Sequence, residues 1–502
     1  MIINASDPEE CRIAIVEDGY LEEFYIESAL KGSKVHNIYK AMIQNVEPSL
    51  QAVFVNFGAE RNGFMQINDV HPEYFLVDPP ERGPIDLRKV LGKGQELLVQ
   101  VTKDATEIKG AALTTYISLA GQFVVLMPGG ENLGVSRKIV DEDERKRLKE
   151  LARDLPVPEA CGVILRTSAA GRTKKDITRD FSHQVRLWEE IRKQVADLPA
   201  PCLVHKEQDL AIRTIRDHFT PEIKEILVDD PDVYERALEY VKVIAPRLQN
   251  MVKLNKDKRP IFSKYQIEEQ TETIFSNEVR LKSGGAIVIN PTEALVSIDV
   301  NSGRSTREAR LEDTAYKTNL EAAEEVARQL RLRDLGGLIV IDFIDMRDTK
   351  HQREVEKKLK AEAKKDKAKI DTGRISKFGL LEMSRQRLRP PIEFGSFHVC
   401  EVCGGRGVIR SAETTALAAL RLMKQKISKG QVDKVTGRLH PVVANYLLNQ
   451  KRHELLSLES RYQVSIHLES DARVLPGSTD LEFIRKSESA DAESAPPQND
   501  GT

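Results

Sequence analysis

Three polar residues on two candidate β-strands are the strongest sign of chemistry in this sequence. Side chains alternate across a strand, so in ALVSIDVNSG the residues Asp299 and Asn301 share one face while Ile298 packs on the other. The segment GLIVIDFIDM places Asp342 in an otherwise apolar strand, which we expect to be buried on both sides. A buried carboxylate is costly unless it is paired, so Asp342 needs a cation or strong hydrogen-bond donors.

The two aspartates predict a divalent metal site. A helical segment at about 311–332 separates the two strands, and this β–α–β order favours a parallel pair with a right-handed crossover. Asp299 and Asp342 then converge near the carboxyl ends of the strands, where open α/β sheets place their ligands. Mg²⁺ prefers such carboxylates together with waters and a phosphate oxygen, and it can assist attack on a phosphodiester. For either acid alone, a helix cap or an ion pair is the more common role.

Cys400 and Cys403, in the segment CEVCGGRG, form a second candidate metal site. A Cys-x-x-Cys pair followed by glycines makes a tight turn that directs both sulfurs at one metal. Structural zinc takes four ligands, and His398 offers only a third. We therefore expect a second copy of the chain to complete the zinc site across a symmetric dimer interface. A redox dithiol and an inert turn are the alternatives.

Aromatic and basic residues near the N-terminus are candidates for contact with a nucleic acid. Phe54 and Phe64 lie on strand-like segments, and Lys103 and Lys109 follow them. Barrels of the OB type bind single strands by stacking bases on exposed aromatics and holding phosphates with lysines. The simpler reading for an isolated phenylalanine is a place in the core.

Arg166 and Thr167 end a strand-like run and form a candidate phosphate pocket, which Arg137 can join. Arginine binds phosphate through two parallel hydrogen bonds, and a neighbouring hydroxyl can add another. A further basic stretch, residues 350–369, holds nine Lys or Arg against four Asp or Glu, and more arginines follow it. Such a surface suits a phosphate backbone, although a solvated helix face is the usual meaning of a lysine-rich helix.

The elements that must position these residues can be read from hydrophobic periodicity. Residues 10–30 predict a hairpin that turns at Asp18 and Gly19. Residues 36–118 predict about five strands of a small OB-type barrel. Residues 119–180 continue as strands and turns, and the pattern becomes helical from Asp180 to Gln249. A second long helix is expected at about 349–368, and a smaller mixed segment follows Glu413 to about Lys486. The last residues have a disordered composition.

Composition restricts the class of protein. With 502 residues the chain exceeds a single core, so we expect several domains. The balance of 40% hydrophobic and 31% charged residues is that of a soluble globular protein, and no apolar run reaches the roughly 18 residues of a membrane span. The first residues lack the order of a secretory leader. Five sparse cysteines argue against a disulfide framework and for a reducing cytoplasm.

The sequence resembles the catalytic half of the bacterial ribonuclease E/G family across about residues 1–485. Within that family it is most similar to the compact ribonuclease G branch, because only a short tail follows residue 486. One departure is Glu401, where the family's zinc motif usually has a proline. The matching stretches are FVNFGAERNGFM, KGAALTTYISLAGQFVVLMP, GVILRTSA, SIDVNSGRST, NLEAAEEVARQLRLRDLGGLIVIDFIDM, FGLLEMSRQRL and CEVCGGRG.

The resemblance implies a Mg²⁺-dependent endoribonuclease. Such an enzyme hydrolyses single-stranded, AU-rich RNA with a 5′-monophosphate and leaves 5′-phosphate and 3′-hydroxyl ends, with roles in rRNA maturation and mRNA decay. Asp299 and Asp342 correspond to the family's metal-binding carboxylates, and Asn301 assists them. The remaining carry-over assigns a 5′-phosphate pocket to Arg166, Thr167 and Arg137, RNA contacts to Phe54, Phe64, Lys103 and Lys109, and a zinc link between protomers to Cys400 and Cys403.

The same resemblance implies a multidomain α/β (α+β) architecture. An RNase H-like domain carries an inserted OB-fold barrel of the S1 type and a 5′-sensor domain, and a DNase I-like βαβ catalytic domain, a zinc link and a small domain follow. The expected ranges are 1–35 with 211–276 for the RNase H-like domain, 36–118 for the barrel, 119–210 for the 5′ sensor, 277–399 for the catalytic domain, 400–414 for the zinc link, 415–488 for a small oligomerisation domain and 489–502 for a disordered tail.

The expected assembly is a cytoplasmic homodimer joined through zinc, and a dimer of two such dimers stays open. Three alternatives also stay open: a shortened ribonuclease E-type enzyme, a non-catalytic RNA-binding protein, and a metal-dependent phosphoesterase that acts on DNA or small substrates. The intact Asp299, Asn301 and Asp342 set speaks against the second, and the barrel with Arg166 and Thr167 speaks against the third.

Overall fold

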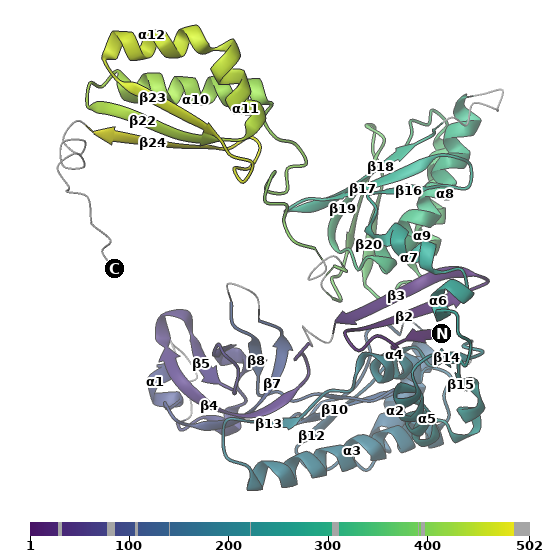
Figure 1. Ribbon diagram of the computed structural model, residues 1–502. Coiled ribbons are helices and arrows are strands. Elements are labelled where there is room, and N and C mark those ends of the chain that lie inside the picture. The colour runs from purple at the N-terminus through teal and green to yellow at the C-terminus, as the bar shows by residue number, and fades with distance from the viewer. Residues whose placement is uncertain are drawn as a thin grey trace. The chain divides into compact units, whose positions relative to one another are not determined.

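The computed structural model describes residues 1–28, 33–77, 86–105, 109–139, 141–220, 222–303, 311–389, 391–392 and 397–485. The chain divides into two compact units, Met1–Gly395 and Ser396–Thr502 (Figure 1). The first unit contains four sheets and the second contains one, counted over these described ranges. The expected mixed α/β, multidomain class is therefore confirmed.

The N-terminal sheet joins segments that lie far apart in the sequence. Its strand order is β15 (Val252–Leu254), β14 (Ile226–Val228), β1 (Ile2–Asn4), β2 (Glu10–Glu17) and β3 (Tyr20–Ser28). The predicted hairpin between β2 and β3 is present, with Asp18 and Gly19 in its turn. Four helices accompany this sheet in the sequence: α4 (Leu210–His218), α5 (Pro231–Ile244), α6 (Ile261–Lys264) and α7 (Glu268–Glu272).

A closed five-stranded barrel follows the first hairpin. Strands β4 (Ile38–Glu47), β5 (Ala52–Asn56), β6 (Gly63–Gln66), β8 (Ala112–Thr114) and β7 (Glu96–Lys103) pair in that order, and β7 pairs back onto β4. The short helix α1 (Leu87–Val90) packs into the same core. Alternate residues such as Val53, Val55 and Met65 fill the interior. The closed barrel is consistent with the predicted OB-like fold.

A four-stranded sheet follows the barrel in the sequence and precedes β14 and β15 of the N-terminal sheet. It contains β9 (Leu119–Ala120), β10 (Val124–Pro128), β11 (Leu133–Val135) and β12 (Cys161–Leu165), and β13 (Cys202–His205) joins the barrel through β4. The expectation of only strands and turns from 119 to 180 is wrong, because α2 (Glu142–Arg153) occupies part of this range. Asp141 caps this helix, but few apolar residues mark its buried face. The next helix, α3 (Lys174–Asp197), also begins earlier than expected.

The last sheet of the first unit carries the candidate acidic site. Its strand order is β16 (Glu278–Arg280), β17 (Ala286–Pro291), β18 (Leu295–Asn301), β19 (Gly337–Asp342), β21 (Leu380–Arg385) and β20 (Ile370–Ile375). Strands β18 and β19 are parallel, and α8 (Leu311–Leu332) connects them, as the β–α–β pattern predicts. The helix α9 (Thr349–Ala363) follows, shorter than expected.

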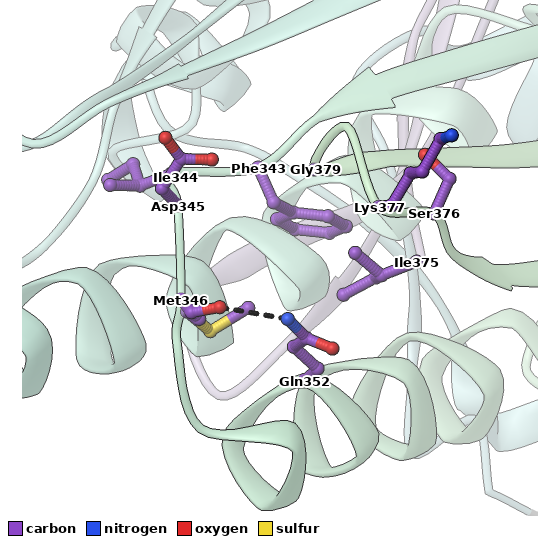
Figure 2. Close-up of a pocket in the computed structure, with 9 residues that line it drawn as sticks. All are labelled: Phe343, Ile344, Asp345, Met346, Gln352, Ile375, Ser376, Lys377 and Gly379. Atoms are coloured by element: carbon purple, nitrogen blue, oxygen red, sulfur yellow. Dashed lines mark hydrogen bonds between the residues drawn. The ribbon is translucent and has the colours of Figure 1, made fainter.

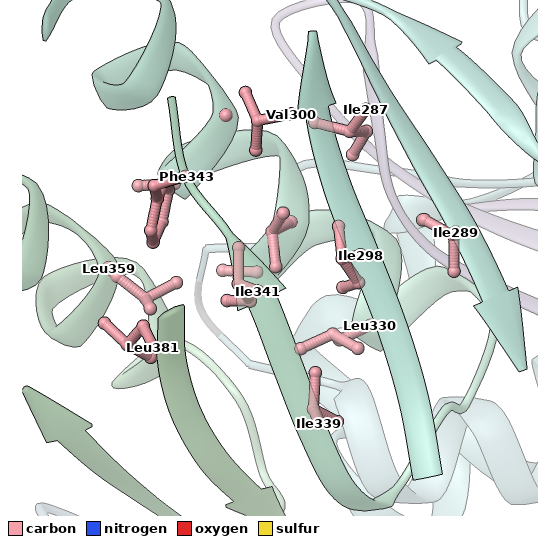
Figure 3. Close-up of a cluster of buried hydrophobic side chains, with 14 of the residues drawn as sticks. Ile287, Ile289, Ile298, Val300, Leu330, Ile339, Ile341, Phe343, Leu359 and Leu381 are labelled. Atoms are coloured by element: carbon pink, nitrogen blue, oxygen red, sulfur yellow. The ribbon is translucent and has the colours of Figure 1, made fainter. Parts of the chain in front are cut away.

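Helices α8 and α9 cover one face of this sheet. Figure 3 shows the shared core, in which Ile298, Ile341 and Leu381 of three strands pack with Leu330 of α8 and Leu359 of α9. The other face is open: Leu338 is 48% exposed, and Asp342 is exposed as well. The expectation that this strand is buried on both sides is therefore wrong, because both helices pack on the same face.

The second unit contains a three-stranded sheet and three α-helices within its described part, residues 397–485. Strand β22 (Val432–Leu439) lies between β23 (Ser465–Ser470) and β24 (Thr479–Arg485). Helices α10 (Ala412–Ile427), α11 (Pro441–Asn445) and α12 (Arg452–Tyr462) pack with it, and Met423 and Leu447 are fully buried. The expected disordered tail falls outside the described residues. No helix in the described ranges has both the length and the apolar content needed to cross a membrane.

Candidate functional site

The two predicted aspartates lie side by side at the carboxyl ends of neighbouring parallel strands. Asp299 of β18 is the register partner of Asp342 of β19, so both side chains share the open face of the sheet. Both are exposed. The Asn301 amide donates to Asp299 Oδ2 at 2.8 Å, which orients that carboxylate. The structure thus brings together the three residues that the sequence pattern selected.

A third carboxylate, Asp345, lies close to this pair and was not selected from the sequence. The marker is Gly379, in the turn between β20 and β21, which has a φ of +81°. A Cβ at this position would lie 3.3 Å from Asp345 Oδ1 and 3.9 Å from Asp342 Oδ1. Glycine therefore lets the turn approach both carboxylates closely. Figure 2 shows Asp345 on one side of a recess and Ser376 and Lys377 on the other side.

Helix α8 fixes the backbone that follows β19. The fully buried Asn319 donates from Nδ2 to the Ile344 carbonyl at 2.8 Å and accepts from the Ile344 N–H at 3.0 Å. Further along, the Glu312 carboxylate accepts from the backbone N–H groups of Arg347 and Asp348. These bonds satisfy backbone groups that no strand pairs, so they hold Asp345 in place.

In the part of the chain that the structure describes, which omits residues 304–310, no Lys or Arg forms an ion pair with the acidic cluster of Asp299, Asp342 and Asp345. Asp342 is exposed but partly desolvated by its surroundings, which raises its pKa, and the nearby charges of Asp299 and Asp345 raise that pKa further. Within the described residues, no group of three His, Cys, Asp or Glu side chains meets the geometry of a metal site. Two exposed carboxylates on adjacent strands still fit Mg²⁺, which completes its shell with water and substrate oxygens.

Three of the four barrel residues selected from the sequence, Phe54, Phe64 and Lys103, are linked by strand pairing. Phe54 of β5 is the register partner of Phe64 of β6, with ring centroids 5.9 Å apart in an edge-to-face arrangement. Phe64 in turn pairs with Ala112, and Ala112 pairs with Lys103. Both rings are half-buried rather than in the core, and Lys103 is exposed. The exposed Lys109 precedes β8 in the sequence.

The three residues of the predicted phosphate pocket follow the ends of two paired strands of the four-stranded sheet. Strands β11 and β12 are parallel, with Val135 opposite Leu165, and the Ser136 N–H donates to the Leu165 carbonyl at 2.8 Å. Arg137 and Thr167 each follow these partners by two residues, and both are exposed. The two positions therefore lie at matching places beyond the two strand ends.

The Arg166 side chain is oriented by Asp217, a residue that sequence reasoning missed. Its Nη1 donates to the Gly121 carbonyl at 2.6 Å and lies 2.8 Å from Asp217 Oδ1. Burial alone would raise the pKa of Asp217, but Arg216 and Arg166 outweigh it and lower that pKa to about 2. Asp217 therefore stays ionised and fixes the orientation of Arg166. No local pattern links residues 217 and 166.

The Cys-x-x-Cys segment in the second unit forms a hydrogen-bonded turn, in which the Gly404 N–H donates to the Cys400 carbonyl at 2.7 Å. The Gly407 N–H donates to Cys403 Sγ at 3.4 Å, and this bond, with others from Gly405 and Arg406, lowers the pKa of the thiol. A lower pKa favours the thiolate, which is the form that binds metal. Cys400 is exposed and Cys403 is half-buried. The expected third ligand, His398, is exposed.

The basic stretch differs from the expected phosphate-binding surface at Arg385. Arg385 is buried in an ion pair with Asp366 at 2.7 Å, and both side chains are under 5% exposed, at 2% and 4%. Lys367 is exposed, with its Nζ 2.8 Å from His218 Nε2. Arg385 therefore stabilises the fold and does not face solvent, because Asp366 neutralises it.

Comparisons with known proteins place the chain among bacterial ribonucleases. The model of the Ribonuclease E/G family matches residues 118–388, and the model described as the thioredoxin-like domain of RNase E/G matches residues 399–484. The chain is 47% identical to ribonuclease E of Haemophilus influenzae, covering 93% of this chain and 50% of that protein. For ribonuclease E of Escherichia coli the identity is 45%, covering 92% and 44%.

Ribonuclease G of Escherichia coli is 34% identical, covering 91% of this chain and 94% of that protein. The chain thus spans about half the length of the ribonuclease E relatives and nearly all of ribonuclease G. Identity is nevertheless higher to the ribonuclease E proteins, so it does not support the expected place in the compact branch. The matches cover most of the chain, and the chain belongs to the ribonuclease E/G family.

Proposed function

We propose that the chain is a Mg²⁺-dependent endoribonuclease that cuts single-stranded RNA at Asp299 and Asp342. One observation carries the proposal: two exposed carboxylates lie in register on adjacent parallel strands, and no Lys or Arg of the described residues forms an ion pair with either of them. A structural acid pair would be neutralised by a cation, as Asp366 is by Arg385. The names of the relatives, ribonuclease E and ribonuclease G, indicate RNA as the substrate class.

In this mechanism Asp299 and Asp342 would hold the ion, and Asn301 keeps Asp299 oriented through its 2.8 Å hydrogen bond. A bound Mg²⁺ supplies positive charge against the charge that develops on the phosphodiester. Water adds to phosphorus and loses a proton, and the bond to the 3′ oxygen breaks. That oxygen takes up a proton, so the products carry a 5′-phosphate and a 3′-hydroxyl.

The remaining candidate residues would bind the RNA strand. Phe54 and Phe64 offer two half-exposed rings for base stacking, and the exposed Lys103 and Lys109 offer charges for the phosphates. Arg166, fixed by Asp217, would bind a 5′-monophosphate together with Thr167 and Arg137. A preference for AU-rich sequence and roles in rRNA maturation and mRNA decay in the cytoplasm belong to the same proposal.

We test the activity with Asp299→Asn. We expect cleavage of a 5′-monophosphorylated single-stranded oligonucleotide in Mg²⁺ to fall by about 10²- to 10³-fold, since one charged ligand is lost. RNA binding, measured without Mg²⁺, should change little. Cleavage by Asp299→Asn at the wild-type rate would refute the assignment of the acidic site. Binding without cleavage by the wild-type chain would identify a non-catalytic RNA-binding protein.

The same assay separates the substrate classes. A 5′-triphosphorylated RNA should be cut more slowly than its 5′-monophosphorylated form, because the added charge and bulk do not suit a small pocket at Arg166. A single-stranded DNA of the same sequence should be cut slowly. Equal rates on DNA would favour a general phosphoesterase.

We also propose that Cys400 and Cys403 bind zinc and join two chains. The support is the hydrogen-bonded turn, which favours the thiolate of Cys403 and, with Cys400, supplies only half of a four-ligand site. Purified wild-type chain should contain about one zinc per two chains, which is the count of a shared site. Cys403→Ser should remove the zinc and shift the mass measured by light scattering from dimer to monomer. A dimer that persists without zinc would refute the shared site.

A further inference from the structure

A recess borders the carboxylate pair on the side of Asp345. Its volume is about 150 Å³. Phe343, Met346 and Ile375 supply apolar lining, while Asp345, Gln352 and Lys377 supply polar groups (Figure 2). Typical small-molecule sites measure roughly 300–1,000 Å³, so this recess suits a single planar group and not a whole cofactor.

The polar groups of the recess are fixed by the fold. The Gln352 amide donates from Nε2 to the Met346 carbonyl at 2.8 Å, and Figure 2 shows this bond across the floor. On the opposite wall, the Ser376 N–H donates to the Leu380 carbonyl at 2.8 Å and closes the turn that carries Lys377. The walls therefore come from two firmly bonded segments, one after β19 and one between β20 and β21.

The side chain of Phe378 lies in the same turn and is exposed to an unusual degree. It is 71% exposed, although a phenylalanine usually packs in a core. The Lys377 ammonium lies 5.0 Å from the centre of its ring, so a cation and an aromatic face occur together. The next residue in the chain, Gly379, lies close to Asp342 and Asp345, so the backbone of Phe378 is one residue away from the acidic site.

We propose that Phe378 and the recess beside it form a base-binding subsite for single-stranded RNA next to the scissile phosphate. One nucleobase stacks on the Phe378 ring, and Lys377 binds the adjoining phosphate. The polar edge of the base faces Asp345 and Gln352, both of which offer acceptor oxygens to an amino group. This inference rests on the proposed function, because the carboxylate pair defines where the scissile phosphate lies.

The closing experiment combines protein and RNA changes. RNA binding is measured without Mg²⁺ by fluorescence anisotropy, with oligonucleotides that lack the base at each position around the cut in turn. For one position, loss of the base should weaken binding to the wild-type chain by about 5- to 150-fold. With Phe378→Ala the same position should cause no further loss, whereas Phe378→Trp should retain the effect.

Tyr20 provides a matched control. It is 52% exposed and has Lys282 Nζ 4.9 Å from its ring centre, so it repeats the surface chemistry of Phe378 on another sheet. Tyr20→Ala should leave the dependence on the base unchanged. If losses from Phe378→Ala and from the missing base multiply independently at every position, the subsite is refuted. If the wild-type chain binds RNA with this dependence but never cuts it, only the proposed function fails.

Discussion

In the sheet that contains β16 to β21, charged side chains are exposed at one end of the central strands and buried in an ion pair at the other end. At the end where β18 and β19 finish, Asp299 and Asp342 are exposed and share one face. At the end where β19 begins, Arg385 and Asp366 form an ion pair that is almost completely buried. The Arg385 guanidinium also donates to the Leu335 carbonyl at 2.7 Å.

This contrast distinguishes charges that stabilise the fold from charges that are available to bind a ligand. A buried ion must be paired and hydrogen-bonded in place, because desolvation is costly. Exposed carboxylates that repel each other contribute little to the fold, and an external cation can relieve their repulsion. The two ends should therefore respond to mutation in different measurements.

The largest effect on stability is expected from Arg385→Met. It leaves the Asp366 carboxylate, which is 4% exposed, without its cation. We expect the free energy of unfolding, measured by urea titration, to fall by about 3 to 5 kcal/mol. The double variant Arg385→Met with Asp366→Leu is the control, because it removes both charges and should recover most of the loss. A single variant as stable as the wild type would show that this pair does not hold the sheet end.

At the opposite end, Asp342→Asn should separate activity from stability. It removes one of two repelling carboxylates, so the melting temperature should not fall, while cleavage in Mg²⁺ should drop by about 10²- to 10³-fold. Asp371→Asn is the matched control, since Asp371 is an exposed acid of the same sheet, on β20. A clear loss of stability in Asp342→Asn would show that Asp342 also stabilises the fold, contrary to the contrast between the two ends of the strands.

A pH titration of Asp334 should sharpen the contrast. Burial raises the pKa of Asp334 to about 6, more than Arg389 and Arg385 lower it. The unfolded value is near 4, so between about pH 4 and 6 the folded chain binds this proton more tightly than the unfolded chain. The contribution of Asp334 to stability therefore grows as the pH falls through that window.

Asp334→Asn should abolish this pH-dependent contribution to the free energy of unfolding. The difference in free energy of unfolding between the wild type and the variant should change by about 3 kcal/mol from pH 7 to pH 4, in favour of the wild type at low pH. Urea titrations of both proteins at each pH give this difference, and the other titrating groups cancel in it. A difference that stays constant with pH would show that Asp334 keeps an ordinary pKa.

Sequence reasoning succeeded where the cause is local. Alternation along β18 placed Asp299 and Asn301 on one face, and the β–α–β order placed Asp342 beside them. The closed barrel was also predictable, because short strands with glycine turns recur at even spacing. The glycines after Cys403 likewise predicted a tight turn, which the structure contains.

The residues that were missed depend on partners that are distant in the sequence. The role of Asp217 becomes evident only from its ion pair with Arg166 in the structure. The place of Asp345 at the acidic site becomes evident only from the turn at Gly379, which lies close to it. The exposure of Asp342 depends on α8 and α9 packing on one face, which an apolar strand does not reveal. Arg385 reads as a surface cation until its partner Asp366 is known.

The smallest effect should come from Asn319, which is a structural residue at the acidic end. Asn319→Leu keeps the volume but leaves the Ile344 N–H and carbonyl without their partners, at a cost of about 1 to 3 kcal/mol in the free energy of unfolding. Since Ile344 adjoins Asp345, cleavage should also fall modestly. Asn319→Asp keeps the acceptor and loses the donor, so its free energy of unfolding should lie between those of the wild type and of Asn319→Leu. If Asn319→Leu weakened cleavage without any loss of stability, Asn319 would act on the reaction directly, and the division between the two ends of the sheet would rest on charge alone.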